Sequence, residues 1–171
     1  QSVQKQWGDV EAVYQLKIDL IPTMYNVMNA TMNFEYNLYV NVTNARNIWQ
    51  NFSGNSADKM NASVQLDIAF LAFVNAVHEA YPDLSAAPVA IQTFMIQYES
   101  VTNQVFSQRK YYNDAVGEYN TAIRKIPGVL FAGAFGFEKA LYYDQDNPAF
   151  DWVTDIIPTE AGMKGDKETI I

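Results

Sequence analysis

A stripe of apolar side chains at heptad spacing, from Phe94 to Ile126, constrains the fold of this chain more than any other feature. Its steps alternate between four and three residues. The stripe consists of Phe94, Tyr98, Val101, Val105, Gln108, Tyr112, Ala115, Tyr119, Ala122 and Ile126. A heptad stripe of this length predicts one long, coiled-coil-like helix. A helix of about 40 residues is about 60 Å long, so we expect other long helices beside it. Gln108 is the polar interruption, which we interpret as a device that sets helix register.

The N-terminal part of the chain has the same helical period. Its first apolar stripe is Val3, Trp7, Val10, Tyr14 and Ile18. Pro22 lacks a backbone donor and clashes with the carbonyl of Ile18, so the helix must kink or restart there. Asp19 is placed to accept a backbone N–H freed by that kink. The period then resumes and continues to Trp49, before a break at residues 51–55. We therefore predict one kinked helical region from Val3 to Trp49.

A second helix is predicted over residues 57–81, with Ser56 as its N-cap. Its apolar stripe is Met60, Val64, Ile68, Leu71, Val74 or Asn75, and His78. Pro82 stops this helix. Ser85 is the expected cap of the third helix, with Pro88 in its first turn.

The chain changes character after the third helix, which Pro127 ends. Residues 129–137 predict a short apolar helix or turn over the end of the bundle. Residues 141–171 contain prolines and glycines and show little periodicity, so we expect an irregular, extended tail. The fold predicted is all-α: an elongated antiparallel three- to four-helix bundle over residues 1–140, with a C-terminal tail over residues 141–171.

Charge and composition exclude several classes of protein. The net charge is −8 and the sequence has no cluster of Lys and Arg, so nucleic acid is not an expected partner. Cysteine is absent, which excludes disulfides and thiolate sites. His78 is the only histidine, whereas a di-metal bundle needs two Glu-x-x-His motifs. We therefore expect no cofactor, no metal and no enzymatic activity. For His78 we favour a packed or capping role at a helix end over proton transfer.

Several features indicate a location outside the cytoplasm. Four sequons begin at Asn29, Asn41, Asn51 and Asn61; the alternative interpretation is an Asn-rich helix face with hydroxyls nearby by accident. No uninterrupted apolar run reaches the length of a membrane span, since the longest, residues 129–137, is about half of that. The chain starts at Gln1 without a Met, from which we expect that a signal or anchor was removed before it.

Four stretches of the chain resemble the LemA family. In order they are residues 14–22 (YQLKIDLIP), 42–46 (VTNAR), 79–84 (EAYPDL) and 109–124 (RKYYNDAVGEYNTAIR). Phe135-Gly136-Phe137 then falls where the family has a Gly-Phe ending. The resemblance covers about Trp7 to Tyr143 and implies a helical domain outside the cytoplasm, usually anchored by a membrane helix that precedes the region of Trp7 in the family and is not expected among these residues. It implies no catalytic or ligand residues, and it gives no counterpart for the tail from about Asp144 onward.

The polar residues of these motifs have two interpretations. Arg46, Arg109 and Arg124 could recognise an anion or a partner; we favour ion pairs with acidic residues such as Asp19, Glu99 or Glu118 on facing helices. Asp19 and Pro22 are most simply a kink device.

Three functions remain as hypotheses. The first is a structural protein, secreted or at the cell surface, that assembles with itself into an oligomer, filament or tube. Low charge and high aromatic content support it, as does an apolar tail that could pack on another copy or fold back on its own bundle. Its candidate self-association residues are Phe150, Trp152, Ile156, Ile157, Ile170 and Ile171. The second is an envelope adaptor that presents other envelope proteins to a membrane-bound machine and reaches the membrane only through a segment outside this chain. The third, a ligand-binding bundle, needs a cavity that the bulky Phe and Tyr stripe argues against.

Overall fold

The computed structural model describes residues 2–30, 36–53, 56–125 and 136–143. All regular secondary structure in this part of the chain is helical, which confirms the all-α prediction. The helices are α1 (Val3–Ile18), α2 (Ile21–Ala30), α3 (Tyr36–Gln50), α4 (Ser56–Ala80), the 3₁₀ helix η1 (Leu84–Ala86) and α5 (Val89–Ala122).

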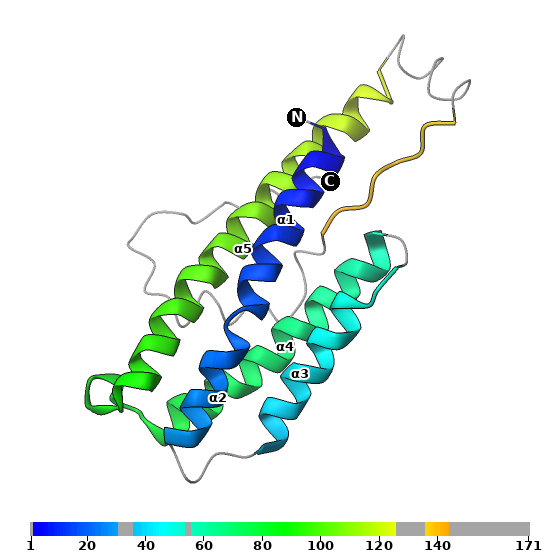
Figure 1. The fold of residues 1–171 in the computed structure, drawn as a ribbon. Helices are drawn as coiled ribbons and strands as arrows, with labels where there is room; N and C mark the ends of the chain where they lie inside the picture. The colour runs from blue at the N-terminus through cyan, green and yellow to red at the C-terminus, as the bar shows by residue number, and fades with distance from the viewer. Residues whose placement is uncertain (1, 31–35, 54–55, 126–135, 144–171) are drawn as a thin grey trace, which may run out of the picture.

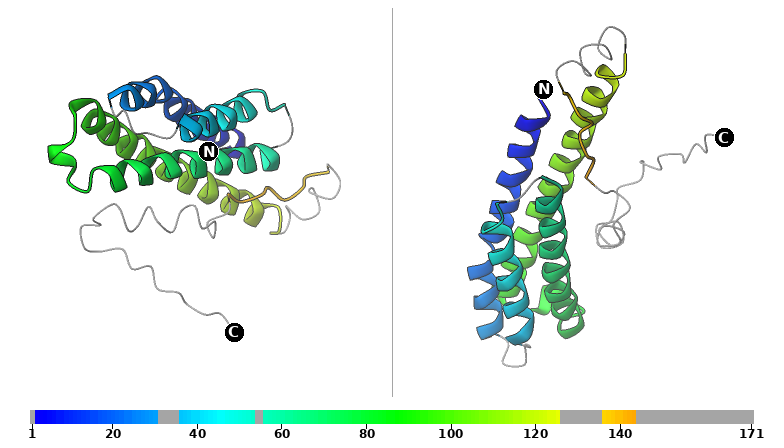
Figure 2. Two further views of the ribbon diagram at one scale, coloured as in Figure 1. Left: turned by 90° about the horizontal axis from the view of Figure 1, so that it is seen from below. Right: turned by 90° about the vertical axis from the view of Figure 1, so that its right-hand side faces the viewer.

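The helices form an elongated body around α5, which has 34 residues. α1 and α2 follow one another along α5, α3 runs back beside α4, and α4 leads through η1 into α5 (Figure 1). α1 and α5 project beyond the pair α3–α4, so one half of the body is a two-helix stem (Figure 2). After a turn at Gly136, residues 137–143 lie along this stem in an extended conformation.

The first helical region breaks at Asp19–Leu20, and Pro22 is the second residue of the next helix, α2. Asp19 still donates its backbone N–H to the carbonyl of Gln15 at 3.0 Å. Its carboxylate accepts a hydrogen bond from Gln15 Nε2, also at 3.0 Å, and not the backbone N–H that we expected. The break lets α2 continue along α5 after α1.

The prediction of a single kinked helix as far as Trp49 is wrong. α2 ends at Ala30, and α3 begins at Tyr36 and runs in the opposite direction (Figure 1). Apolar period alone cannot reveal this reversal, because two antiparallel helices that face one core have the same spacing of buried positions.

The sequence identified α4 and only part of the face that it buries, since Met60 and Val74 of the predicted stripe are buried. The predicted stripe included Ile68, which is 43% exposed. The buried apolar side chains of α4 are Met60, Ala62, Leu66, Phe70, Phe73, Val74 and Val77. Apolar residues occur around the whole circumference of α4, so their spacing did not select one face.

α4 is also the one described helix that is long and apolar enough to cross a membrane, over Asp58–Ala80. This helix contains no long uninterrupted apolar run, because polar residues occur between its apolar ones. Half of the residues in the most apolar part of this helix are buried inside the molecule, as they are in a helix that contributes to a core.

Two predictions for α5 also need correction: the residue that caps its start, and the polar residue within its buried stripe. Asp83, not Ser85, caps the chain here: it accepts the Ser85 backbone N–H at 2.9 Å and so begins η1. Pro88 is the N-cap of α5. Gln108 is only half-buried, whereas its neighbour Arg109 is buried, as are Thr102, Asn113 and Asn120 on the same helix.

The short helix or turn predicted over residues 129–137 lies outside the described residues, apart from its last two positions. Of these, Gly136 is in a turn and Phe137 is exposed. Gly136 has a φ of +68°, the left-handed region that favours glycine. The candidate self-association residues of the tail, Phe150 to Ile171, also lie outside the described residues.

Candidate functional site

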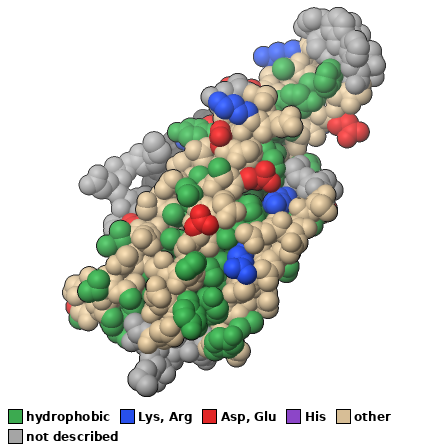
Figure 3. Space-filling model, viewed as in Figure 1, with side chains coloured by type: hydrophobic (Ala, Val, Ile, Leu, Met, Phe, Trp, Pro, Cys, Tyr) green, Lys and Arg blue, Asp and Glu red, His purple; other side chains and the backbone are tan. Residues whose placement is uncertain are grey.

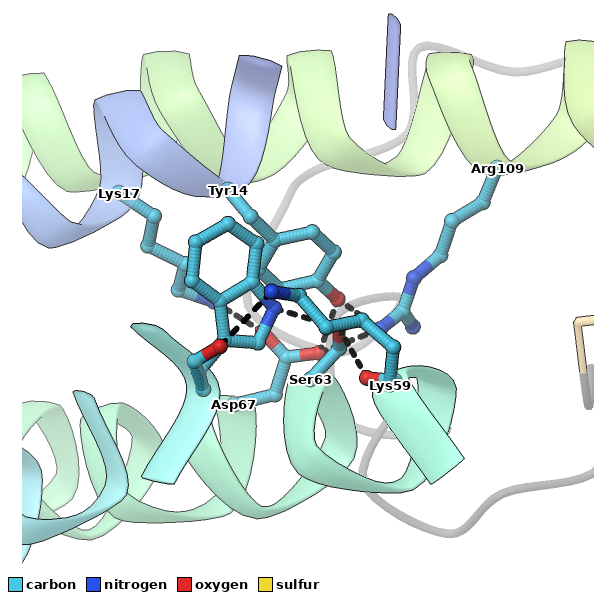
Figure 4. A network of polar contacts seen from close by, with 7 residues as sticks. Tyr14, Lys17, Lys59, Ser63, Asp67 and Arg109 are labelled. Carbon is cyan, nitrogen blue, oxygen red and sulfur yellow. Dashed lines mark hydrogen bonds and ion pairs between the residues drawn. The ribbon is translucent and has the colours of Figure 1, made fainter. Parts of the chain in front are cut away.

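A buried cluster of charges around Asp67 joins α1, α4 and α5 (Figure 4). Asp67 Oδ1 lies 2.6 Å from Lys17 Nζ, and Asp67 Oδ2 lies 2.7 Å from Arg109 Nη2. The hydroxyl of Tyr14 donates a hydrogen bond to Asp67 Oδ2 at 2.7 Å and accepts one from Arg109 Nη2. One carboxylate thus connects three helices that are far apart in the sequence.

All members of this charge cluster are removed from solvent. The side chains of Lys17, Asp67 and Arg109 are 2%, 4% and 7% exposed. Burial is the largest single influence on both pKa values, lowering that of Lys17 and raising that of Asp67. At Lys17, Asp67 together with Tyr98 and Tyr143 outweighs burial, so its pKa is raised. Burial lowers the pKa of Arg109 to about 10, so Arg109 remains charged at neutral pH.

Aromatic rings enclose both cations. Lys17 Nζ lies 5.3 Å from the ring centres of Phe70 and Tyr98. The Arg109 guanidinium lies 4.1 Å from the ring centre of Tyr143. Cations over aromatic faces gain electrostatic attraction that partly replaces lost hydration, so the rings help to keep two cations in the core.

A second polar group beside the charge cluster fixes α3 to α4. Trp49 Nε1 donates to Ser63 Oγ at 2.9 Å, and Ser63 Oγ donates to the carbonyl of Lys59 at 2.9 Å. Lys59 Nζ donates to the carbonyl of Trp49 at 2.8 Å and lies 4.0 Å from its ring centre. Ser63 therefore has a role in the core that is independent of the sequon at Asn61.

Two Tyr-Asn pairs on α5 hold an extended segment of the chain against the stem. We call residues 138–143 the strap, and Tyr112, Asn113, Tyr119 and Asn120 the clamp. Asn120 Nδ2 donates to the carbonyl of Ala140 at 3.0 Å, and Asn120 Oδ1 accepts the Ala140 N–H at 2.9 Å. Asn113 makes the same two bonds with Tyr143, at 3.1 and 2.7 Å.

The tyrosines of the clamp also bind the main chain of the strap. The Tyr112 hydroxyl donates to the carbonyl of Leu141 at 3.0 Å, and the Tyr119 hydroxyl donates to the carbonyl of Glu138 at 3.0 Å. Asn113 and Asn120 are seven residues apart, so they lie on the same side of α5. The clamp therefore binds the strap as a neighbouring β-strand would, through backbone N–H and C=O groups.

Tyr143 connects the strap to the charge cluster. Its side chain is 2% exposed, stacks on Trp7 with ring centres 6.0 Å apart, and lies over Arg109. Burial raises the pKa of Tyr143 to about 12, so the phenol is neutral at ordinary pH. Clamp, strap and charge cluster together form one continuous site along the stem.

A scan against models of protein families matches residues 6–153 to the LemA family. This chain belongs to the LemA family. Searches of the curated proteins and of the solved structures found no match. The family match continues ten residues beyond Tyr143, which corrects the expectation that the family likeness ends near Asp144 and brings Phe150 and Trp152 within the matched region.

The LemA-like motifs coincide with this site. The motif at residues 14–22 supplies Tyr14 and Lys17 to the charge cluster, and the motif at residues 109–124 supplies Arg109 and the whole clamp. These motif residues therefore have a structural explanation: they hold three helices and the strap together.

The sequence predicted an ion pair for Arg109 but named the wrong partners. Arg109 pairs with Asp67, not with Asp19, Glu99 or Glu118. The missed signal was that Asp67 is the only charged residue between Lys59 and His78, and a lone charge in an apolar helix needs a partner when it is buried.

The other predicted residues lie away from the charge cluster. Arg46 is half-buried and donates to Asn47 Oδ1 at 3.0 Å, and Arg124 is exposed. Asn29, Asn41, Asn51 and Asn61 are all exposed on helices or at a helix end. His78 is half-buried in the last turn of α4.

An open pocket of about 330 Å³ lies against the clamp and the strap, lined mainly by Trp7, Tyr112, Tyr119 and Ala140. Within the described ranges, no group of three His, Asp or Glu side chains could hold a metal ion. One shallow groove of about 440 Å³ lies at the open end of the stem, lined mainly by Val3, Gln4, Glu118 and Tyr119. The arrangement is suited to holding chain segments together and to binding an extended peptide.

Proposed function

We propose that this LemA-family domain is a non-enzymatic structural protein located outside the cytoplasm, which assembles with itself into an oligomer or filament. The observation that carries the proposal is that exposed aromatic and apolar side chains occur toward both ends of an elongated body. Contacts between two different surfaces of identical molecules generate open chains when the rotation between copies does not close a ring.

The first of these surfaces lies at the end of the body where α2 meets α3. Tyr25 and Tyr36 are 47% and 65% exposed. Each packs against Tyr39, with ring centres 5.8 and 6.4 Å apart. We call Tyr25, Tyr36 and Tyr39 the tyrosine end.

Charge is scarce around the tyrosine end. Between Asp19 and Arg46 the sequence has a single charged residue, Glu35. In Figure 3 most charged side chains on the visible face lie in its upper half, away from this end. A surface that combines aromatic side chains with few charges is typical of the centre of a protein–protein interface.

The second surface is the strap side of the stem. Phe137, Leu141 and Tyr142 are 55%, 55% and 54% exposed. The strap lies on the half of the body that is formed by α1 and α5, whereas the tyrosine end lies at the far end of α2 (Figure 1). Joining these two surfaces on successive copies would cover apolar area on each of them.

The proposal is tested by the molecular mass in solution. We expect light scattering coupled to size-exclusion chromatography to show species larger than the 19.3 kDa chain, with a mass that rises with protein concentration. Tyr25→Ser combined with Tyr36→Ser should shift the population toward monomer. Tyr111→Ser is the matched control, because Tyr111 is 54% exposed but lies on α5, outside the tyrosine end.

A monodisperse monomer at high concentration, with no filaments in negative-stain images, would overturn the proposal. Equal loss of assembly in the control would show that the tyrosine end is not the contact. The proposed location is checked separately by fractionating the native cells, where the chain should be found outside the cytoplasmic fraction.

A further inference from the structure

The hydrogen bonds between the clamp and the strap all go to the main chain of the strap, and one buried side chain, Tyr143, adds apolar contact. Six hydrogen bonds from the clamp reach backbone atoms of Glu138, Ala140, Leu141 and Tyr143. Recognition of this kind adds a strand-like segment to a protein surface and does not depend on most of the segment's side chains.

The groups that form the clamp are preorganised. Asn113 and Asn120 are each 6% exposed and lie inside one continuous helix. An amide side chain that offers both an N–H donor and a C=O acceptor satisfies one residue of an extended chain completely. If the strap left, the side-chain amides of Asn113 and Asn120 would lose their hydrogen-bond partners. Another extended segment or water would have to replace the strap, since an unpaired polar group in the core is costly.

One side chain of the strap gives the clamp its selectivity. Tyr143 fills the space between Trp7, Tyr112 and Arg109. An extended segment with Tyr three residues after a small residue, as in Ala140 to Tyr143, fits both the polar and the aromatic part of the site. Another copy of this chain carries that segment by definition.

We propose that the clamp is an exchangeable binding site for an extended segment, and that in the assembled protein it takes the strap of a second copy. The inference rests on the proposed self-assembly and adds to it a contact at the strap side of the stem that does not involve the tyrosine end. Every contact between strap and clamp is the same within one chain and between two chains. The balance between the two states is therefore set by the connection from α5 to the strap and by protein concentration.

Two side chains of the strap stay partly exposed while its backbone edge is bound. Leu141 and Tyr142 remain 55% and 54% exposed while the backbone edge is bound. Tyr142 also touches α5, because its hydroxyl would lie 3.6 Å from a Cβ at position 117, so it reports which stem the strap lies on.

The test uses the full chain, which has no cysteine of its own. One preparation carries Gly117→Cys on α5 and the other carries Tyr142→Cys on the strap. A Cβ at position 117 would lie 3.6 Å from the Tyr142 hydroxyl, which is ordinary contact, so the substitution fits and the two positions face each other. The preparations are mixed under assembling conditions and treated with a short bismaleimide, and covalent heterodimers are measured.

We expect heterodimers in the mixture and monomeric internal links in the double variant Gly117→Cys/Tyr142→Cys at low concentration. Gly117→Cys mixed with Ser100→Cys, an exposed position on α5, measures random collisions and should give several-fold less product.

Asn120→Ala provides a directional check. Placed in the Gly117→Cys copy, it weakens the accepting clamp, and the yield of heterodimer should fall. Placed in the Tyr142→Cys copy, it weakens the clamp that competes for the strap, and the yield should rise. A merely local destabilisation would change the yield in the same direction in both cases.

The outcomes separate the two proposals. Assembly with internal links alone, or with heterodimers that ignore the position of Asn120→Ala, would overturn strap exchange and leave self-assembly standing. A chain that is monomeric at every concentration would overturn both. Assembly with the opposed response to Asn120→Ala supports both.

Discussion

At the level of single residues, Asp67 has the largest energetic consequence. Its carboxylate accepts hydrogen bonds from Lys17, Tyr14 and Arg109, which come from two other helices. Taking these charges out of water is costly, and their contacts with Asp67 offset that cost only while the cluster is complete. The cluster specifies which faces of α1, α4 and α5 meet, because any other alignment would leave a charge buried alone.

Asp67→Asn should destabilise the fold strongly. The substitution keeps the size of the side chain but leaves Lys17 and Arg109 buried without a carboxylate, which typically costs about 3–5 kcal/mol of unfolding free energy. Urea denaturation followed by Trp fluorescence would measure the loss. Asp114→Asn, at an exposed position on α5, is the control and should change stability by less than about 0.5 kcal/mol. Similar small effects of both variants would contradict the structural role of Asp67.

Tyr143 should make the fold sensitive to alkaline pH. Its folded pKa is raised from 10.0 to about 12 by burial. Between these values the folded state keeps a proton that the unfolded state has lost, so stability falls as pH rises. The raised pKa of Lys17 likewise makes stability fall as pH rises. The lowered pKa of Arg109 acts in the opposite direction and makes stability rise with pH.

Tyr143→Phe isolates this contribution because it keeps the ring over Arg109 and removes the ionisable hydroxyl. We expect the variant to lose less unfolding free energy than the parent between pH 10 and 12. Urea denaturation at a series of pH values gives both slopes. Tyr142→Phe, at an exposed neighbour, should follow the parent; a parallel fall in all three proteins would refute the assignment.

At the level of elements, the strap is a strand-like segment that pairs with side chains of a helix. Asn113 and Asn120 replace the backbone of a partner strand, and Tyr143 anchors the end of the strap in the core. The domain boundary proposed after residue 140 falls inside this segment, and Tyr143 belongs to the core of the bundle.

Asn113→Ala should release the C-terminal end of the strap. The Tyr143 backbone N–H loses its acceptor, Asn113 Oδ1, now 2.7 Å away. Loss of two hydrogen bonds of ordinary strength predicts that amide exchange at Tyr143 speeds up by about tenfold or more. Hydrogen exchange read by NMR would show it, with the Ala140 amide as an internal reference because Asn120 still holds it. Asn103→Ala, exposed on α5, should leave both rates unchanged.

At the level of the whole molecule, an elongated body with a net charge of −8 has to overcome repulsion between copies before its apolar ends can meet. The tyrosine end is almost free of charge in the sequence between Asp19 and Arg46, so the repulsion comes from more distant groups. Repulsion over such distances is screened by salt, whereas apolar contact is not.

Assembly should therefore strengthen with ionic strength. Raising NaCl from about 20 mM to about 150 mM shortens the screening length from about 20 Å to about 8 Å, and the average mass in solution should rise at constant protein concentration. Sedimentation velocity would measure it. If the average mass falls with salt, ion pairs and not apolar ends hold the copies together.

The sequence alone determined the helical class, the long apolar stripe of α5, the break before Pro22 and the likeness to the LemA family, because each depends on residues that are close along the chain. Only the tertiary structure decided which face of α4 is buried, that α3 turns back along α4, that Arg109 pairs with Asp67, and that Asn113 and Asn120 bind the strap. Arg109 contacts residues 42 and 95 positions away. Local periodicity reports which side chains share a face of one helix, but it contains no information on the helix or segment that will cover that face.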